Sequence, residues 1–278
     1  MRLEVEIAPK KGTYIIPINY HYPLSTALRS ILFDNDGSDF RNWMFKNDYT
    51  DEDVKPALPF TFSRLFTKNS RVNENMLASE GNAKFVLTLP VKNAHEESFI
   101  DQIRSNNNLK ISNDHISSIF KIMNVKKIPY PHFKQETKYK MLSPTILTKQ
   151  TIHNGKSRLY YYRPHDEELP EKLENNLKFK YEYYYEKPFN DRIKVRLDKN
   201  YLKNVKRATK LITIKEGDHD EVKLKTFICP LTISAPVEIH KIAYSLGIGE
   251  MNDMGFGMIE ELNHFRNLIK NNLNLNNK

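Results

Sequence analysis

The beginning of the chain alternates between apolar and charged side chains. Across residues 2–8, Leu3, Val5 and Ile7 share one side, and charged residues occupy the other. A period of two is typical of a strand in a sheet with one covered face. Residues 23–33 then carry apolar side chains at helical spacing, and we expect this helix to cover the apolar face of the strand.

The rest of the first half continues with strand and helix patterns. It predicts a short helix near 39–46, a helix near 95–104, and strands near 60–66, 83–91 and 116–127. With the first strand and helix, the order becomes strand, helix, strand, strand, helix, strand. This is the order of a ferredoxin-like fold.

The second half begins after Pro129-Tyr130-Pro131, which we interpret as a linker. The patterns that follow predict two helices, at 167–185 and 236–246. They also predict strands near 138–149, 191–197, 207–215 and 221–233. The second half can therefore be interpreted as another ferredoxin-like arrangement.

These patterns predict an α+β protein with two tandem ferredoxin-like domains, residues 1–128 and 132–262, the second of which carries a C-terminal glycine-rich loop. A length of 278 residues suits two domains, given a prior of roughly 100–200 residues per domain. An asparagine-rich tail, 263–278, follows. We expect this tail to be a frayed helix or disordered.

Composition argues against several classes of protein. The chain has no run of 18 apolar residues, and a strand-like pattern starts directly after Met1, so we expect no membrane span, no signal peptide and a cytoplasmic location. Cys229 is the single cysteine, which excludes an internal disulfide framework and a cysteine zinc site. Core packing is its expected role. The motifs of zinc hydrolases, serine esterases and two-metal nucleases are missing, and no metal or cofactor is predicted.

The net charge of +9 is compatible with a polyanionic partner, although a basic protein can also lack such a ligand. The distribution of the charge favours the partner. Within 192–197 each cation alternates with Ile, Val or Leu, so a strand here would present an all-basic face. We expect a track for phosphates, whose affinity falls with salt at a log–log slope of about −0.7 per neutralised phosphate. Its residues are Arg192, Lys194, Arg196, Lys206, Arg207 and Lys210.

Residues 247–257 hold four of the nine glycines, in two Gly-hydrophobe-Gly clips. This density predicts positive φ angles and the close approach of a partner to the backbone, with a flexible turn as the plain alternative. The loop follows a helix and precedes a strand, the reverse of a dinucleotide-binding turn. Its exposed N–H groups could still bind an anion. The positions concerned are Gly247, Gly249, Asn252, Gly255 and Gly257.

The glycine-rich loop, the helix before it and the following Met258-Ile259-Glu260 resemble the C-terminal signature of the CRISPR-associated endoribonucleases that cut precursor repeat RNA, the Cas-six type of the RAMP superfamily. Three further stretches, 17–24, 59–63 and 141–145, occur in the order of that family. The resemblance spans nearly the whole chain. It implies two tandem ferredoxin-like domains that bind CRISPR repeat RNA in a cleft and cut it once per repeat to produce guide RNAs.

The implied reaction is metal-independent. The 2′-hydroxyl attacks its own neighbouring phosphate and leaves a 2′,3′-cyclic phosphate and a 5′-hydroxyl. A base must take the hydroxyl proton, an acid must protonate the leaving oxygen, and a cation should offset charge on the phosphorane. Each proton transfer contributes about 10²–10⁴ in rate. Histidine is the usual residue for this role because its pKa lies near neutrality.

The best-known pattern of this family has a tyrosine on the first helix, a histidine shortly after it and a lysine before the Phe-Thr motif. This chain has Arg29, Phe45 and Leu58 at those positions. We therefore assign catalysis to Arg29 and to two neighbouring substitutes, His21 and Lys46. Structural roles stay open for all three: a hydrogen bond for His21, a solvated helix position for Arg29 and a polar turn for Lys46.

The departure from the usual triad leaves a second hypothesis, a non-catalytic subunit of the same family that binds repeat RNA. A generic RNA-binding regulator is a third. CRISPR repeat RNA is the expected partner, and subunits of a CRISPR interference complex and a second copy of the chain stay open. The tyrosine runs 160–162 and 183–185 could stack on bases or pack in the core. We expect His240 to support the site from behind or to lie at the surface.

Overall fold

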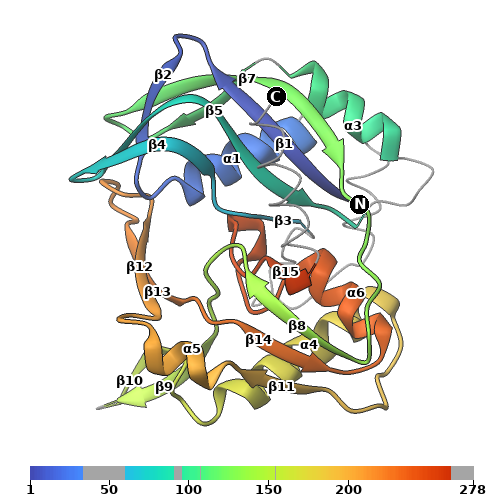
Figure 1. Ribbon diagram of the computed structural model, residues 1–278. Helices are drawn as coiled ribbons and strands as arrows, with labels where there is room; N and C mark the ends of the chain where they lie inside the picture. Colours follow the sequence, from blue (N-terminus) through green and yellow to red (C-terminus); the bar gives the residue numbers. More distant parts are fainter. Residues whose placement is uncertain (34–59, 91–95, 107, 154, 264–278) are drawn as a thin grey trace. The chain divides into compact units, whose positions relative to one another are not determined.

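Two structural units make up the protein (Figure 1). The computed structural model describes residues 1–33, 60–90, 96–106, 108–153 and 155–263. Unit 1 consists of Met1–Ile128, Ile212–Leu224 and Met251–Gly255, and unit 2 of Pro129–Leu211, Lys225–Glu250 and Phe256–Lys278. The second half of the chain therefore contributes two short segments to the unit that the first half builds.

An antiparallel sheet forms the centre of unit 1. Its order is β2-β5-β1-β7-β6, and β3 and β4 also pair with β5. The strands are β1 (Arg2–Pro9), β2 (Thr13–Pro17), β3 (Thr61–Phe62), β4 (Phe66–Asn73), β5 (Met76–Thr88), β6 (Leu109–Ser112) and β7 (Ser117–Lys127). The helices are α1 (His21–Phe33) and α3 (Glu96–Ser105). The central β1 lies between β5 and β7, as the first strand of a ferredoxin-like sheet does.

The first strand and helix form as the alternation predicts. Leu3, Val5 and Ile7 have no exposed surface, and they share one core cluster with Leu24 and Leu28 of α1. Helix α3 joins the same cluster, and Figure 1 shows α1 and α3 running across the sheet. The burial of this one face is what fixes the register of β1.

Unit 2 contains a second antiparallel sheet, of order β11-β14-β8-β15. Its strands are β8 (Glu136–Met141), β11 (Lys194–Leu197), β14 (Leu231–Ser234) and β15 (Ile259–Glu261), and its long helices are α4 (Leu169–Tyr185) and α6 (Val237–Leu246). Leu177 of α4, Val195 of the sheet and Ile242 of α6 belong to one buried cluster. The chain order β8-α4-β11-β14-α6-β15 confirms the predicted α+β class and the ferredoxin-like arrangement.

Unit 2 also carries a short helix and parts of two hairpins that lie outside this sheet. They are α5 (Lys199–Asn204), the hairpin of β9 (Thr148–His153) with β10 (Lys156–Tyr161), and the hairpin of β12 (Thr209–Ile214) with β13 (Val222–Phe227). Residues 212–224 of the second hairpin belong to unit 1. There Asn19 Oδ1 accepts a hydrogen bond from the Thr213 N–H at 3.2 Å.

Several strand predictions were too long or incomplete. The expected strand near 138–149 ends at Met141 because Pro144 interrupts it, and the one near 221–233 is divided at Pro230; proline has no N–H for a sheet ladder. The expected strand near 60–66 is two strands, β3 and β4. The sequence did not predict the β9–β10 hairpin, whose exposed Ile152 and Leu159 break the usual alternation. The helix expected near 39–46 lies outside the described residues.

Cys229 is buried, as predicted, and burial raises the pKa of its thiol to about 11. None of the helices in the described ranges has the length and hydrophobicity that crossing a bilayer would require.

Candidate nucleic-acid interface

All four glycines of the loop adopt positive φ angles. The values are 74° at Gly247, 70° at Gly249, 80° at Gly255 and 73° at Gly257. Residues with a side chain rarely occupy this region. The prediction of positive φ is therefore confirmed, and the sequence signature reflects the conformation of the backbone.

Two of these glycines also allow the protein to pack closely against itself. A Cβ atom on Gly249 would lie 2.3 Å from the carbonyl oxygen of Ile146. A Cβ atom on Gly255 would lie 2.3 Å from Cε2 of Phe62. Both distances are far below contact distance. At these positions the close approach that glycine permits is made by the protein's own atoms.

Four N–H groups of the loop in unit 2 are used internally. The Gly249 N–H donates to Asn176 Oδ1 at 2.8 Å, the Glu250 N–H to the Ile146 carbonyl at 2.9 Å, and the Gly257 N–H to the Pro144 carbonyl at 2.7 Å. The Ile248 N–H donates to the Gly257 carbonyl at 2.9 Å and joins the two clips. An RNA phosphate would have to compete with these hydrogen bonds.

Two residues of helix α4, one turn apart, hold the first Gly-hydrophobe-Gly clip, Gly247-Ile248-Gly249. Asn176 Nδ2 donates to the Gly249 carbonyl at 3.2 Å, in addition to accepting from its N–H, and Lys180 Nζ donates to the Gly247 carbonyl at 2.8 Å. Removal from water lowers the pKa of Lys180 to about 7, although the nearby Glu250 carboxylate opposes this change. Glu250 in turn accepts hydrogen bonds from the N–H and Oγ1 of Thr148, at 3.1 and 2.9 Å. Sequence reasoning missed Asn176 and Lys180, because their i, i+4 spacing places them on one face of the predicted helix without showing what that face contacts.

The middle of the loop, Met251–Gly255, belongs to unit 1. Asn252–Met254 form a 3-10 turn. Ser25 Oγ of α1 donates to the Asp253 carbonyl at 2.7 Å, and Arg29, one turn further along α1, forms an ion pair with the Asp253 carboxylate. Burial raises the pKa of the Asp253 carboxyl, and Arg29 opposes that increase.

The structure describes two of the three predicted catalytic residues. The side chain of Arg29 is 38% exposed overall, although its Nε atom is buried. His21 is the first residue of α1, is only 6% exposed and stacks on Tyr20 with ring centroids 4.9 Å apart. Lys46 lies outside the described residues, as do Phe45 and Leu58.

Of the two roles expected for His240, support of the site from behind or a surface position, the surface position is wrong. The residue has no exposed surface, its Nδ1 lies 2.7 Å from the Tyr139 hydroxyl and its Nε2 lies 3.3 Å from the Gln135 carbonyl. Burial lowers the pKa of the imidazole. His240 thus belongs to the core of unit 2, because α6 turns this position toward the sheet.

Strand β11 presents its cations as predicted. Lys194 and Arg196 are exposed and Val195 is buried, and Arg192 is exposed just before the strand. Sheet register places Arg196 opposite Thr232, and Thr232 opposite Lys138 on β8, so Lys138 extends the same face. We call this surface the basic sheet face; its cations are Lys138, Arg192, Lys194 and Arg196.

One acid interrupts the basic sheet face. Glu136 forms an ion pair with Arg196 and accepts a hydrogen bond from Ser234 Oγ at 3.0 Å. Hydrogen bonding by Arg196 lowers the pKa of this carboxyl. Lys194 therefore contributes more unbalanced charge to the face than Arg196 does.

A groove of about 980 Å³ borders this face within unit 2. Lys138 and Arg196 line it from the sheet, and Lys199 and Lys203 line it from α5. Asp198 begins α5 by accepting a hydrogen bond from the Tyr201 N–H at 2.9 Å. The remaining predicted cations, Lys206, Arg207 and Lys210, are exposed but do not line this groove.

The tyrosine runs divide between core and surface. Tyr162 is buried, and the hydroxyl of Tyr160 donates to Asp166 Oδ2 at 2.8 Å. Tyr184 and Tyr185 are partly exposed. Within the described ranges, no three His, Cys, Asp or Glu side chains are grouped as a metal site would require.

Solved structures share this fold. The chain matches the structure titled "An RAMP protein binding different RNA substrates" with a TM-score of 0.72 and 17% identity, over 94% of this chain and 99% of the other. It matches "CRISPR associated protein Cas6" with a TM-score of 0.71 and 21% identity, again over 94% and 99%. A structure from the characterization of a Cas6-related gene of Pyrococcus furiosus matches with a TM-score of 0.72 and 18% identity, over 94% of this chain and 98% of the other. The fold is thus that of RAMP proteins.

The family follows from the sequence. The family model described as "CRISPR associated protein Cas6, C-terminal" matches residues 123–261, half of the chain. The chain belongs to the Cas6 family. It is also 24% identical to the CRISPR-associated endoribonuclease Cas6 1 of Methanocaldococcus jannaschii. The alignment spans 266 residues and covers 93% of this chain and 92% of the relative. The resemblance inferred from the glycine-rich loop is confirmed.

Proposed function

We propose that this protein binds CRISPR repeat RNA and cuts precursor transcripts once within each repeat to produce guide RNAs. The reaction is metal-independent and leaves a 2′,3′-cyclic phosphate and a 5′-hydroxyl. Membership of the Cas6 family, through residues 123–261, is the observation that carries the proposal. The exposed cations of unit 2 support it, because phosphate contacts provide much of the affinity for RNA.

The proposed RNA contacts fall into two groups. Lys194 and the other cations of the basic sheet face contact phosphates directly, with Lys206, Arg207 and Lys210 extending the path. The loop positions Gly247, Gly249, Asn252, Gly255 and Gly257 give the backbone the shape against which RNA lies. Their internal hydrogen bonds and close packing favour a role in shaping the site over a role in donating to phosphate.

The proposed chemistry uses Arg29, His21 and Lys46. A guanidinium cannot act as a base near neutral pH, so Arg29 offsets charge on the phosphorane. His21 can transfer a proton only if RNA binding exposes its ring. Lys46 supplies a further cation.

A second candidate function, a subunit that binds repeat RNA without cutting it, is favoured by two contacts. Arg29 is paired with Asp253, and His21 is buried against Tyr20. Neither residue is displayed as the catalytic residues of a ribonuclease usually are. Repeat RNA would still bind to the basic sheet face.

Labelled repeat RNA from the protein's own CRISPR array, incubated with the protein in excess EDTA, tests the two candidates. One cut per repeat, ending in a cyclic phosphate, supports the enzyme. Tight binding without a cut supports the non-catalytic subunit. Binding no tighter than to a shuffled RNA contradicts both.

Two matched variants separate catalysis by Arg29 from its contact with the loop. Arg29→Ala removes the cation and the ion pair, whereas Asp253→Asn removes the charge of the partner and keeps the guanidinium. If Arg29 acts on the phosphorane, we expect Arg29→Ala alone to slow single-turnover cleavage, by about 10²-fold. Equal rates for the two variants would show that Arg29 only positions the loop.

A further inference from the structure

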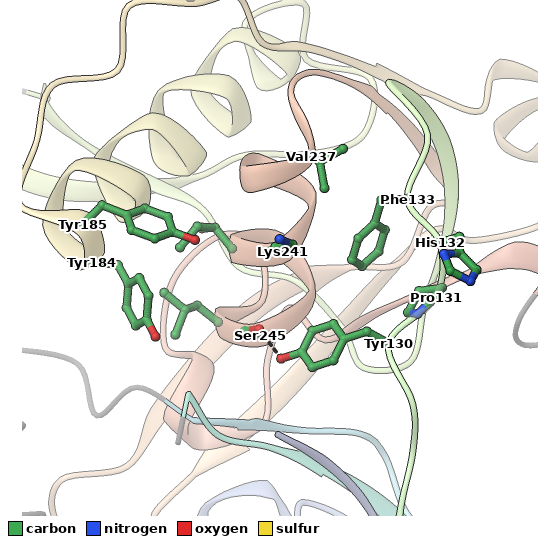
Figure 2. A pocket seen from close by; sticks show the side chains of 11 residues that line it. Tyr130, Pro131, His132, Phe133, Tyr184, Tyr185, Val237, Lys241 and Ser245 are labelled. Atoms are coloured by element: carbon green, nitrogen blue, oxygen red, sulfur yellow. Dashed lines mark hydrogen bonds between the residues drawn. The ribbon is translucent and has the colours of Figure 1, made fainter. Parts of the chain in front are cut away.

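Unit 2 has a second pocket, on the side where α4 and α6 cover the sheet. It has a volume of about 440 Å³ and is lined by the linker and the residues directly after it, the end of α4 and one side of α6. Figure 2 shows Tyr184 and Tyr185 on one side, Tyr130 and Phe133 on the other, and Lys241 between them. This volume lies within the range of small-ligand sites, roughly 300–1,000 Å³.

The Tyr130 and Phe133 wall is fixed by the core behind it. Tyr130 lies 5.3 Å from the ring of Tyr244, and its hydroxyl is 2.7 Å from Ser245 Oγ of α6. Phe133 stacks on buried His240 with a centroid distance of 5.8 Å. Rings held in this way lose little entropy when a ligand stacks on them.

The opposite wall is more exposed. Tyr184 and Tyr185 are 38% and 36% exposed, and their rings meet edge to face at 5.1 Å. Lys241 is exposed and forms no ion pair with any other residue that the structure describes. A flat aromatic group can therefore enter between the walls, and an anion attached to that group can reach the Lys241 ammonium.

We propose that this aromatic pocket binds one unpaired base of the RNA, with Lys241 contacting an adjacent phosphate. The inference rests on the proposed RNA binding and adds a position for a base. Aromatic side chains with a nearby cation are the usual means of holding single-stranded RNA, since every base has a π-face and a neighbouring phosphate. The pocket is lined by residues of unit 2 alone.

Repeat RNA with 2-aminopurine placed at each unpaired position in turn provides the test. Stacking quenches this base, so we expect one position to lose fluorescence when the wild-type protein binds. Tyr184→Ala should restore the fluorescence and weaken binding about 5- to 100-fold. Tyr184→Phe keeps the ring and should restore quenching. Phe179→Ala removes a 60% exposed ring from the same helix outside the pocket and should change neither signal.

Lys241→Gln tests the phosphate contact and should reduce the salt slope of binding by about 0.7. If wild-type protein binds repeat RNA but no position is quenched, or if Tyr184→Ala binds as tightly as wild type, the pocket proposal is overturned and the proposed function stands. Loss of self-association in Tyr184→Ala with unchanged RNA binding would also overturn it and assign the pocket to a second copy of the chain. Failure of wild-type protein to bind repeat RNA would overturn both.

Discussion

The glycine-rich loop and the basic sheet face differ in how much of their chemistry is already used inside the protein. Gly249 and Gly255 pack against protein atoms, and four loop N–H groups in unit 2 donate to protein acceptors. On the basic sheet face, Lys194 and Arg192 are exposed. The stronger sequence signal thus marks backbone that packs within the protein, and the weaker one marks cations that remain exposed.

Placing a side chain on Gly255 should have the largest effect. Gly255→Val combines a clash with Phe62 and a φ of +80°, and we expect a loss of about 2–6 kcal/mol in the free energy of unfolding. Denaturant titration measures it. Gly81→Val is the control, since Gly81 has a φ of +69° and no atom near its Cβ position, so backbone strain acts alone. Equal losses for the two variants would show that the Phe62 contact is unimportant.

Removing charge from the basic sheet face should have the next largest effect, on binding alone. We expect Arg192→Gln with Lys194→Gln to weaken repeat-RNA binding about 10- to 100-fold and to reduce the salt slope by about 1.4, which corresponds to two phosphates. The unfolding free energy should stay within about 0.5 kcal/mol of wild type, as is usual for exposed sites.

The exposed pair Lys10 and Lys11 of unit 1 supplies the matched control for this double variant. Changing both to Gln removes the same charge from a different surface. An equal loss of affinity would mean that net charge, rather than the basic sheet face, governs binding.

Loosening the first clip should have an intermediate effect on stability. Asn176→Ala leaves the N–H and carbonyl of Gly249 without this partner, and we expect a cost of about 1–3 kcal/mol. Asn175→Ala, at an exposed neighbour on α4, is the control. RNA affinity measured on both variants sharpens the comparison: if only Asn176→Ala binds weakly, the shape of the loop matters for RNA.

The titration of Lys180 should have the smallest effect, a change of the unfolding free energy with pH. Its folded pKa of about 7 lies below the usual 10.5, so between these values the unfolded chain binds a proton that the folded chain does not. The contribution of Lys180 to stability therefore rises with pH across this window. Because the side chain is partly exposed, we expect the free energy of unfolding to rise by only roughly 1–2 kcal/mol across this window.

Lys180→Met should remove this rise, measured as the unfolding free energy at pH 6.5, 8 and 9.5. Lys178→Met, at an exposed ion-paired position of the same helix, should not. A wild-type profile parallel to that of Lys180→Met would contradict the assignment.

The parts of the fold that the sequence predicted are those with one buried face. The alternation at 2–8 and the helical spacing of Ile239, Ile242 and Ala243 both correspond to buried side chains. The β9–β10 hairpin was missed because its strands are exposed on much of both sides, so no apolar period marks them, whereas β12 and β13 were predicted as strands and bury Ile212, Ile214 and Leu224. The assignment of Met251–Gly255 to unit 1 depends on Ser25 and Arg29, more than 220 residues away, and no local pattern encodes it.

The glycines show the same limit at the candidate site. Positive φ could be predicted from their density, because only the local backbone is involved. Which atoms approach the backbone could not, because Phe62 and Ile146 reach the loop through tertiary packing. Asn176 and Lys180 were missed for the same reason. The sequence does not distinguish a polar helix residue that contacts solvent from one that contacts a loop.

The buried imidazole of His240 has a practical consequence for pH–rate profiles. Its folded pKa is lower than that of a free histidine, so acid favours the unfolded chain, which accepts the proton more readily. Acidification should therefore loosen the packing behind Phe133 and Tyr139, which contact this imidazole. A fall in cleavage rate on that acidic limb would report the melting of this domain together with any protonation of a general base, and only a parallel near-ultraviolet circular dichroism trace would separate them.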